Sequence, residues 1–220
     1  MAIARDAISQ GASNGQSTLT FSHTCSGSDR ILFVSLGQGA SNSASGVTYN
    51  STAMTRVNTQ NVSGTTFMNM SIWYLVAPST GANNIVVTNG GTGFNWALAS
   101  SYTGVDQSSP INPSGGNTGV ATASSLAVSI TTGADNEWIY GIAMSGSSDS
   151  AFTAGTNTSL LAMNVNGWDG HFDTNSAQTP AGSKTVNINR ASSGLFGMNI
   201  VAFAPVGSAP TINSNFFNLF

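Results

Sequence analysis

The chain has 220 residues, which is enough for one large all-β domain, or two small ones, with a sizeable core. Charged residues make up only 6% of it, against about 25% in ordinary soluble proteins, and the net charge is −3. This composition leaves no basic patch for nucleic acid, no apolar run long enough to span a membrane, and no N-terminal run of signal-peptide length.

Hydroxyl and amide groups must carry most of the surface, because Gly, Ser, Thr and Asn are abundant while Lys184 and Glu137 are the only lysine and glutamate. Extracellular and virion β-proteins often have such surfaces, and metabolic enzymes seldom do. Cys25 is the only cysteine, so no disulfide can form within the chain. The fold must therefore rest on packing.

Strand-like runs follow one another along the chain, with turn-forming residues between them. No segment of helical length keeps apolar residues at the i, i+3, i+4 spacing. The predicted strands are 3–9, 18–25, 30–36, 46–49, 53–59, 67–77, 84–88, 95–103, 124–131, 138–145, 160–165, 184–189 and 194–204. Short strands at this spacing predict an all-β fold, an antiparallel β-sandwich.

Segment 67–78, F-M-N-M-S-I-W-Y-L-V-A-P, is the longest apolar-rich run. Its β-branched and aromatic residues favour a strand over a helix, and alternation makes its second half apolar on both faces. We predict a central strand covered on both sides. A two-layer sandwich covers one face only, so Trp73 and Leu75 need a second cover, from segment 106–123 or from the end of the chain. We therefore expect Trp73 to be exposed in an isolated subunit and buried at an interface.

No linker divides the chain, and the polar, proline-containing segment 106–123 is predicted to cross between two sheets. The sequence predicts one sandwich domain over 1–204, followed by an extended C-terminal arm over 205–220. The arm contains Phe216, Phe217, Leu219 and Phe220. Burying each of these side chains would contribute about 1.5–3 kcal/mol. The arm either folds back onto one end of its own sandwich or, as we expect, packs on a neighbouring subunit as an interface.

Three stretches carry a family resemblance: G-V-T-Y-N-S-T-A-M-T-R-V (46–57), S-I-W-Y-L-V-A-P-S-T-G-A-N-N-I-V-V-T (71–88) and S-Y-T-G-V-D-Q-S-S-P-I (101–111). Together they resemble a β-sandwich module of bacteriophage structural and bacterial surface proteins. Its usual course is a V-x-Y-x-G-x-x-[LM]-T hairpin, a W-Y-L-x-x-P strand and a G-V-[DN]-Q-x-x-P loop. The resemblance covers residues 3 to about 204, with Asn50 and Ser51 standing where a glycine is usual. It implies a concanavalin-like or jelly-roll sandwich used in adhesion or virion architecture, without a standard catalytic set.

One cluster has the residue types of a metal site, D-G-H-F-D at 169–173. On a strand, Asp169, His171 and Asp173 share a face and could converge on one cation. The alternative is a polar loop or outer strand face with Asx turns closed by the two aspartates, and we expect no metal and no other cofactor. Trp168, beside the cluster, either presents an aromatic platform for a sugar ring or anchors a loop.

Catalytic sets are harder to assemble from this sequence. Glycoside hydrolysis needs two carboxylates flanking the bond, and Glu137 sits at a turn-to-strand junction where we expect it to face solvent. A Ser–His–acid set would need His23 or His171 as its base, and no G-x-S-x-G elbow occurs. His23 and Cys25 share a strand face, but a separation of about 6.5–7 Å is too long for a nucleophile–base bond. We therefore expect no catalytic site and no enzyme.

These features together predict a non-enzymatic structural protein of a bacteriophage virion, in particular a capsid decoration (cement) protein assembled in the host cytoplasm. Its expected partners are copies of itself, a trimer by analogy with local threefold positions, and the major capsid protein. Neither nucleic acid nor a membrane is an expected partner. The alternative is a carbohydrate-binding adhesin or tail-fibre module, whose partner would be a glycan.

Overall fold

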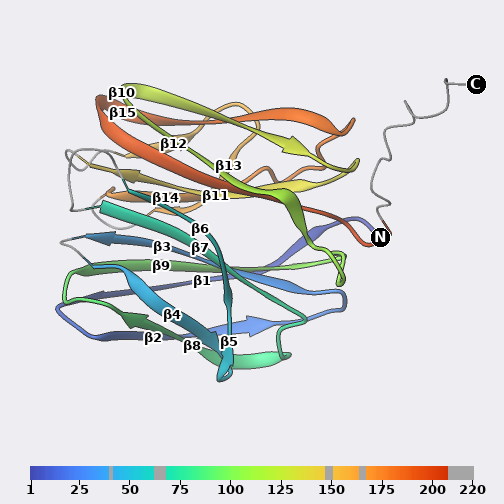
Figure 1. Cartoon of the computed structure of the whole chain (residues 1–220), viewed down its shortest axis with the longest axis horizontal. Helices are drawn as coiled ribbons and strands as arrows, with labels where there is room; N and C mark the ends of the chain where they lie inside the picture. The colour runs from blue at the N-terminus through green and yellow to red at the C-terminus, as the bar shows by residue number, and fades with distance from the viewer. Residues whose placement is uncertain (40–41, 62–67, 147–150, 164–166, 208–220) are drawn as a thin grey trace, which may run out of the picture.

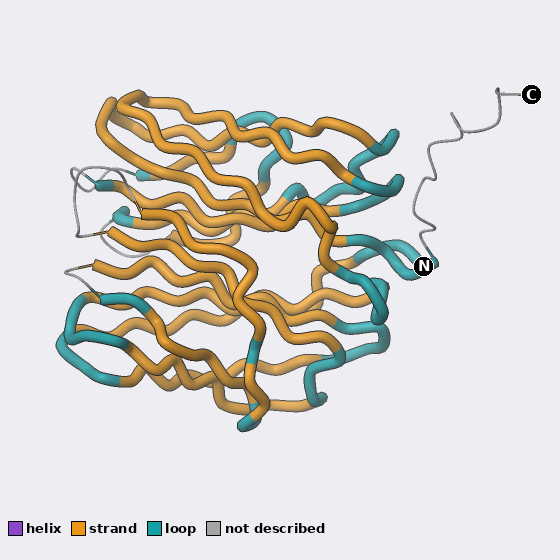
Figure 2. The backbone as a smooth tube through the Cα atoms, viewed as in Figure 1, coloured by secondary structure: helices purple, strands orange, loops and turns teal. Residues whose placement is uncertain are grey.

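The computed structural model describes residues 1–39, 42–61, 68–146, 151–163 and 167–207. This part of the chain is all-β and antiparallel, which confirms the predicted fold class, and none of it is a helix able to cross a membrane. The strands form three sheets stacked one above another, which we call the lower, central and upper sheets as they lie in Figure 1. Figure 2 shows the connections gathered at the two ends of this stack.

The central sheet comes from the first half of the chain. Its strand order is β1 (Ala4–Asn14), β9 (Phe94–Thr103), β3 (Ile31–Gly39), β7 (Met68–Val76) and β6 (Thr55–Asn61). The middle strand β3 is buried along its whole length, so both of its faces must pack. Its sequence I-L-F-V-S-L-G-Q-G is accordingly apolar on both faces over its first half.

The lower sheet covers one face of the central sheet. Its order is β2 (Thr18–Cys25), β8 (Gly81–Asn89), β4 (Ala44–Tyr49) and β5 (Thr52–Ala53). β8 alternates cleanly, with Ile85 and Val87 buried. The β4–β5 hairpin turns through Asn50 and Ser51, whose φ angles of 46° and 63° are those of a two-residue type I′ turn.

The lower sheet also explains the two-faced second half of β7. Trp73 is only 6% exposed and packs in the core between the central and lower sheets, with the Arg56 guanidinium 5.4 Å from the centroid of its ring. Its indole N–H donates to Ser71 Oγ at 3.0 Å. The expected exposure of Trp73 in an isolated subunit is therefore wrong. The lower sheet of the same chain provides the second cover, so the argument that placed Trp73 at a subunit interface fails.

The upper sheet covers the other face of the central sheet. Its order is β10 (Ile111–Thr132), β15 (Gly182–Phe203), β11 (Trp138–Ser145), β14 (Asp169–Asp173) and β13 (Ser159–Met163), and β12 (Phe152–Ala154) pairs with β15. An aromatic cluster fills the core between the two sheets. In it Phe33 stacks on Tyr140 at 4.9 Å between ring centroids and contacts Tyr102 and Phe203 edge-on.

The two long strands β10 and β15 bend together and fold back over the upper sheet. Their pairing shifts register between Ala123 and Ser125, and a Cβ built on Gly119 would lie 2.7 Å from Val128 Cγ2 of the same strand. Val128, with Ile130, Val186 and Ile188, thus packs on the outer face of the sheet. Segment 111–123 is therefore a strand and not the predicted crossover loop, and predicted strands 184–189 and 194–204 are one continuous strand.

Candidate functional site

The three side chains of the predicted metal cluster lie on β14 and point into the core between the upper and central sheets. Asp169, His171 and Asp173 alternate along the strand and are all buried. The alternative expectation, a polar loop or outer strand face, is wrong because β14 is an interior strand between β11 and β13. Their polar atoms therefore need partners inside the protein.

One half of the cluster is a hydrogen-bonded chain that crosses from sheet to sheet. His171 Nε2 lies 2.9 Å from Asp169 Oδ2, and His171 Nδ1 lies 2.6 Å from Ser35 Oγ of the central sheet. Ser35 Oγ lies 2.5 Å from the hydroxyl of Tyr140 on β11. Gly37 on β3 keeps room for the carboxylate, because a Cβ there would lie 3.3 Å from Asp169 Oδ2.

The other half of the cluster is an ion pair. Arg5 on β1 donates two hydrogen bonds to Asp173, from Nε to Oδ2 at 2.9 Å and from Nη2 to Oδ1 at 2.6 Å. The Tyr102 hydroxyl also donates to Asp173 Oδ2, at 2.7 Å. Burial lowers the pKa of Arg5, but its hydrogen bonds and charge interaction with Asp173 more than offset this, so the pKa is raised overall. Burial, followed by the charge of Asp173, raises the pKa of Tyr102 well above its ordinary value.

This geometry determines what the cluster can do. Asp169 pairs with His171 while Asp173 pairs with Arg5, so the three side chains do not converge on one cation. Within the described residues no three His, Cys, Asp or Glu side chains are placed to hold a metal ion. Ser35, His171 and Asp169 have the residue types of an acyl-transfer set, but Ser35 has no exposed surface. No substrate can reach its hydroxyl in this fold, so the network locks two sheets together.

The second histidine also lies in a buried network, which the local pattern around it did not predict. His23 on β2 lies 2.8 Å from Ser9 Oγ through Nδ1 and 3.0 Å from Ser101 Oγ through Nε2. Ser101 in turn donates to Asp6 Oδ2 at 2.8 Å. Burial is the main cause that lowers the pKa of His23 to about 4, against a smaller opposing effect from the charge of Asp6. His23 therefore acts as a neutral link between β1, β2 and β9.

Glu137 is buried, which corrects the expectation that it faces solvent. Its carboxylate accepts hydrogen bonds from the backbone N–H groups of Gly133 and Ala134, both at 2.9 Å, and from the side-chain amide of Asn112. The only glutamate of the chain therefore closes the turn that leads into β11. This is a structural role, like that of an Asx-type turn closure.

Trp168, the predicted sugar platform, is half-buried immediately before β14. Its backbone carbonyl accepts a hydrogen bond from Ser145 N–H at 2.8 Å, so the residue is tied to the end of β11. This placement agrees better with a loop anchor than with an open platform. Residues 164–166, which precede it closely, lie outside the described part of the chain.

A more exposed aromatic pair lies on β9, where sequence reasoning did not place one. Phe94 and Trp96 are stacked, with ring centroids 5.4 Å apart and planes 2° from parallel, and Phe94 is 45% exposed. Ile8 on the neighbouring edge strand β1 is exposed to the same degree and shares the face of the sheet. The F-N-W alternation at 94–96 was the available signal, but Phe94 fell outside the predicted strand 95–103.

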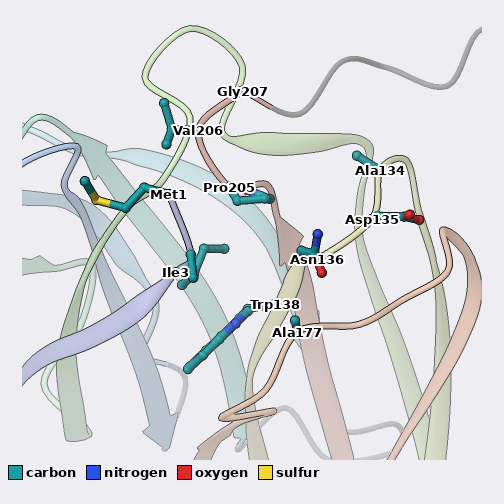
Figure 3. Close-up of a pocket in the computed structure, with 11 residues that line it drawn as sticks. Met1, Ile3, Ala134, Asp135, Asn136, Trp138, Ala177, Pro205, Val206 and Gly207 are labelled. Atoms are coloured by element: carbon teal, nitrogen blue, oxygen red, sulfur yellow. The ribbon is translucent and has the colours of Figure 1, made fainter.

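A pocket of about 720 Å³ opens at the end of the stack where the described chain begins and ends. We call it the end pocket. Figure 3 shows side chains from four segments around it, with Ile3 and Trp138 close together. Its lining includes Ile3, Ala134, Trp138, Ala177, Pro205 and Val206. The predicted interface residues Phe216, Phe217, Leu219 and Phe220 lie outside the described residues, in the segment that follows Gly207 on the rim of this pocket.

No protein-family model matches this chain, and a comparison with curated proteins finds no match either. The function is therefore inferred from the residues of the chain itself.

Proposed function

We propose that this chain is a non-enzymatic structural protein of a bacteriophage virion, and specifically a capsid decoration (cement) protein. In this role a rigid β-sandwich sits on the shell and stabilises it through contacts with other copies of itself, as a trimer by analogy, and with the major capsid protein. The observation that carries the proposal is the arm. Residues 208–220 contain no charged side chain, yet residues 216–220 include four large apolar ones, Phe216, Phe217, Leu219 and Phe220.

The described core supports this role, because its ionisable side chains are used for cohesion. Asp173 is paired with Arg5, His171 joins the central and upper sheets, and Glu137 closes a turn. Three sheets held together in this way make a stiff body, as a cement protein needs. The outward-facing residues are mainly hydroxyl- and amide-bearing, which suits a surface crowded by neighbouring subunits.

Binding to shells tests the proposal. The proposal predicts that capsid proteins are encoded beside this gene. Shells are made by co-expressing those proteins, and the full chain is added and sedimented with them. We expect the wild-type chain to co-sediment at a fixed ratio to the major capsid protein. A variant with Phe216, Phe217, Leu219 and Phe220 all changed to serine should lose most of this binding.

The matched control changes Asn213, Asn215 and Asn218 of the same segment to serine, which alters the arm without removing apolar side chains. This control should bind like the wild type, and all three proteins should melt at the same temperature. Wild-type chain that stays in the supernatant, or full binding by the Phe-to-Ser variant, would refute the cement role for the arm.

The stacked pair Phe94–Trp96 favours one second candidate, a carbohydrate-binding adhesin or tail-fibre module. An exposed ring face on a rigid sheet is a surface on which the apolar face of a sugar ring can pack. A glycan array tests it with the wild-type chain, Phe94→Ala and Trp168→Ala. This candidate predicts a retained glycan that Phe94→Ala releases and Trp168→Ala leaves bound. It fails when the wild-type chain retains no glycan.

A further inference from the structure

The end pocket has walls that are fixed by the main chain. Val206 N–H donates to Gly104 O at 2.9 Å, which holds the strand that leaves the upper sheet against the turn after β9. On the opposite wall Gln178 N–H donates to Glu137 O at 2.8 Å. Because these bonds join segments that are distant in sequence, the pocket is pre-formed and an occupant does not have to open it.

The lining of the end pocket is mixed, with polar and apolar surface in about equal shares. Ile3 and Trp138 belong to the core between the central and upper sheets and reach the pocket from inside, while Ala177 and Val206 contribute at the outer side. Among the described residues that line the pocket, only Asp135 has a charged side chain, and Met1 adds the N-terminal amino group. A lining of this kind suits a peptide that brings both amide groups and aromatic or aliphatic side chains.

The arm has the complementary chemistry and starts at the pocket itself. Gly207 lies on the rim, and eight residues, 208–215, separate it from Phe216. For the arm to enter its own pocket, these eight residues would have to leave the rim and reverse. They include Pro210 and no glycine, and ordering them in a closed loop costs conformational entropy. An arm arriving from a second copy needs no such reversal, and its cost is instead the translational and rotational entropy of association.

We propose that the end pocket of one copy receives the Phe216–Phe220 segment of a second copy of this chain. This inference names the site that receives the arm. It rests on the proposed function for its biological setting. The contact is heterologous, pocket to arm, and each copy both gives and receives an arm when the rotation between successive copies closes a ring.

Cross-linking between two differently labelled chains tests the docking directly. Ala177→Cys places one thiol in the pocket wall, Phe217→Cys places one thiol in the arm, and the native Cys25 is buried. When the two single variants are mixed under mild oxidation, a disulfide between them can only join two copies. The control replaces Ala177→Cys by Ala12→Cys, an exposed position towards the opposite end of β1.

We expect the pocket variant to give about tenfold or more cross-linked dimer than the Ala12→Cys control, because docking raises the effective concentration of the arm at the pocket. Equal yields from the two mixtures overturn the pocket as the receptor. The double variant Ala177→Cys/Phe217→Cys is oxidised in parallel. A disulfide within one chain in this variant, with no dimer from the mixture, overturns the second copy as the donor.

A binding measurement in trans completes the test without cysteines. The probe is a fluorescent peptide with the sequence of residues 211–220, added to the full-length chain whose own Phe216, Phe217, Leu219 and Phe220 are serine. We expect saturable binding that the additional pocket change Ala177→Arg abolishes, and binding that ignores Ala177→Arg counts against the proposal. If the arm docks in the pocket but the chain does not attach to shells, this inference stands and the cement role is rejected. If the chain attaches to shells but the arm does not dock, the cement role stands and this inference is rejected.

Discussion

The pH dependence of folding stability should carry the signature of His23. Its pKa is lowered from 6.5 to about 4, chiefly because the imidazole is buried between β1, β2 and β9. In the unfolded chain the imidazole of His23 binds a proton below about pH 6.5, whereas in the folded chain it binds one only below about pH 4. The stabilisation is therefore complete above pH 6.5 and is lost as the pH falls towards 4.

The size of the effect follows from the two pKa values. Linkage gives a loss of about 2 kcal/mol at about pH 5 and of about 3 kcal/mol at about pH 4, relative to neutral pH. The titratable groups beside the ring are Asp6 on β1 and Tyr49 on β4, whose ring centroid is 6.4 Å away. Of these, only Asp6 titrates in the acid range, and its charge opposes the effect of burial.

Urea unfolding of the wild type and of His23→Gln, between neutral pH and about pH 4, isolates the contribution. Glutamine keeps a donor and an acceptor for Ser9 and Ser101 but has no proton to gain, while every other group titrates in both proteins. The free energy of unfolding of the wild type should fall by about 3 kcal/mol more than that of the variant over this range. Parallel pH profiles would refute the burial argument.

Three further substitutions test the stacked core. Trp73→Ala should lower the free energy of unfolding of the isolated subunit by about 3–5 kcal/mol, as measured by denaturation. Its oligomeric state, measured by light scattering, should not change. A loss of assembly at unchanged stability would contradict the packing of Trp73 between the central and lower sheets. Asp173→Asn removes the negative charge and one of the two oxygens that accept from Arg5. It should cost about 2 kcal/mol, because the arginine is 28% exposed and partly hydrated; an unchanged melting temperature would reject the ion pair. Ser35→Ala should cost about 1–2 kcal/mol, since it leaves Tyr140 and His171 without a shared partner; a more stable variant would show that the network is not cohesive.

Local pattern was sufficient to predict most of the strands. The alternation in 67–78 identified a strand covered on both faces, and β7 is such a strand. The identity of the cover was not predictable, because periodicity reports which face is apolar and not which element packs on it. Trp73 was assigned to an interface because a sandwich has two layers, whereas this chain forms three sheets and covers Trp73 itself.

The long paired strands β10 and β15 and the buried polar strand β14 were not predicted, for a related reason. Pro113 and Gly115 are turn formers and fall in the register shift between Ile111 and Gly116, yet β10 pairs with β15 on both sides of this irregularity and continues as a strand. The polar sequence of β14 looks like a surface, yet it is buried because its partners are supplied from far away. Ser35 is 136 residues from His171, and Arg5 is 168 residues from Asp173. The spacing of residues along one segment cannot predict pairs between residues so far apart in the sequence.

Under the cement proposal a bacteriophage encodes this chain, and the most direct test of this central claim is a cryo-electron microscopy map of its virions. The cement proposal predicts copies of the three-sheet body on the outer surface of the shell, with each Phe216–Phe220 segment seated in the end pocket of a neighbouring copy. A map that places the chain only in the tail fibres, or in no part of the virion, would contradict it.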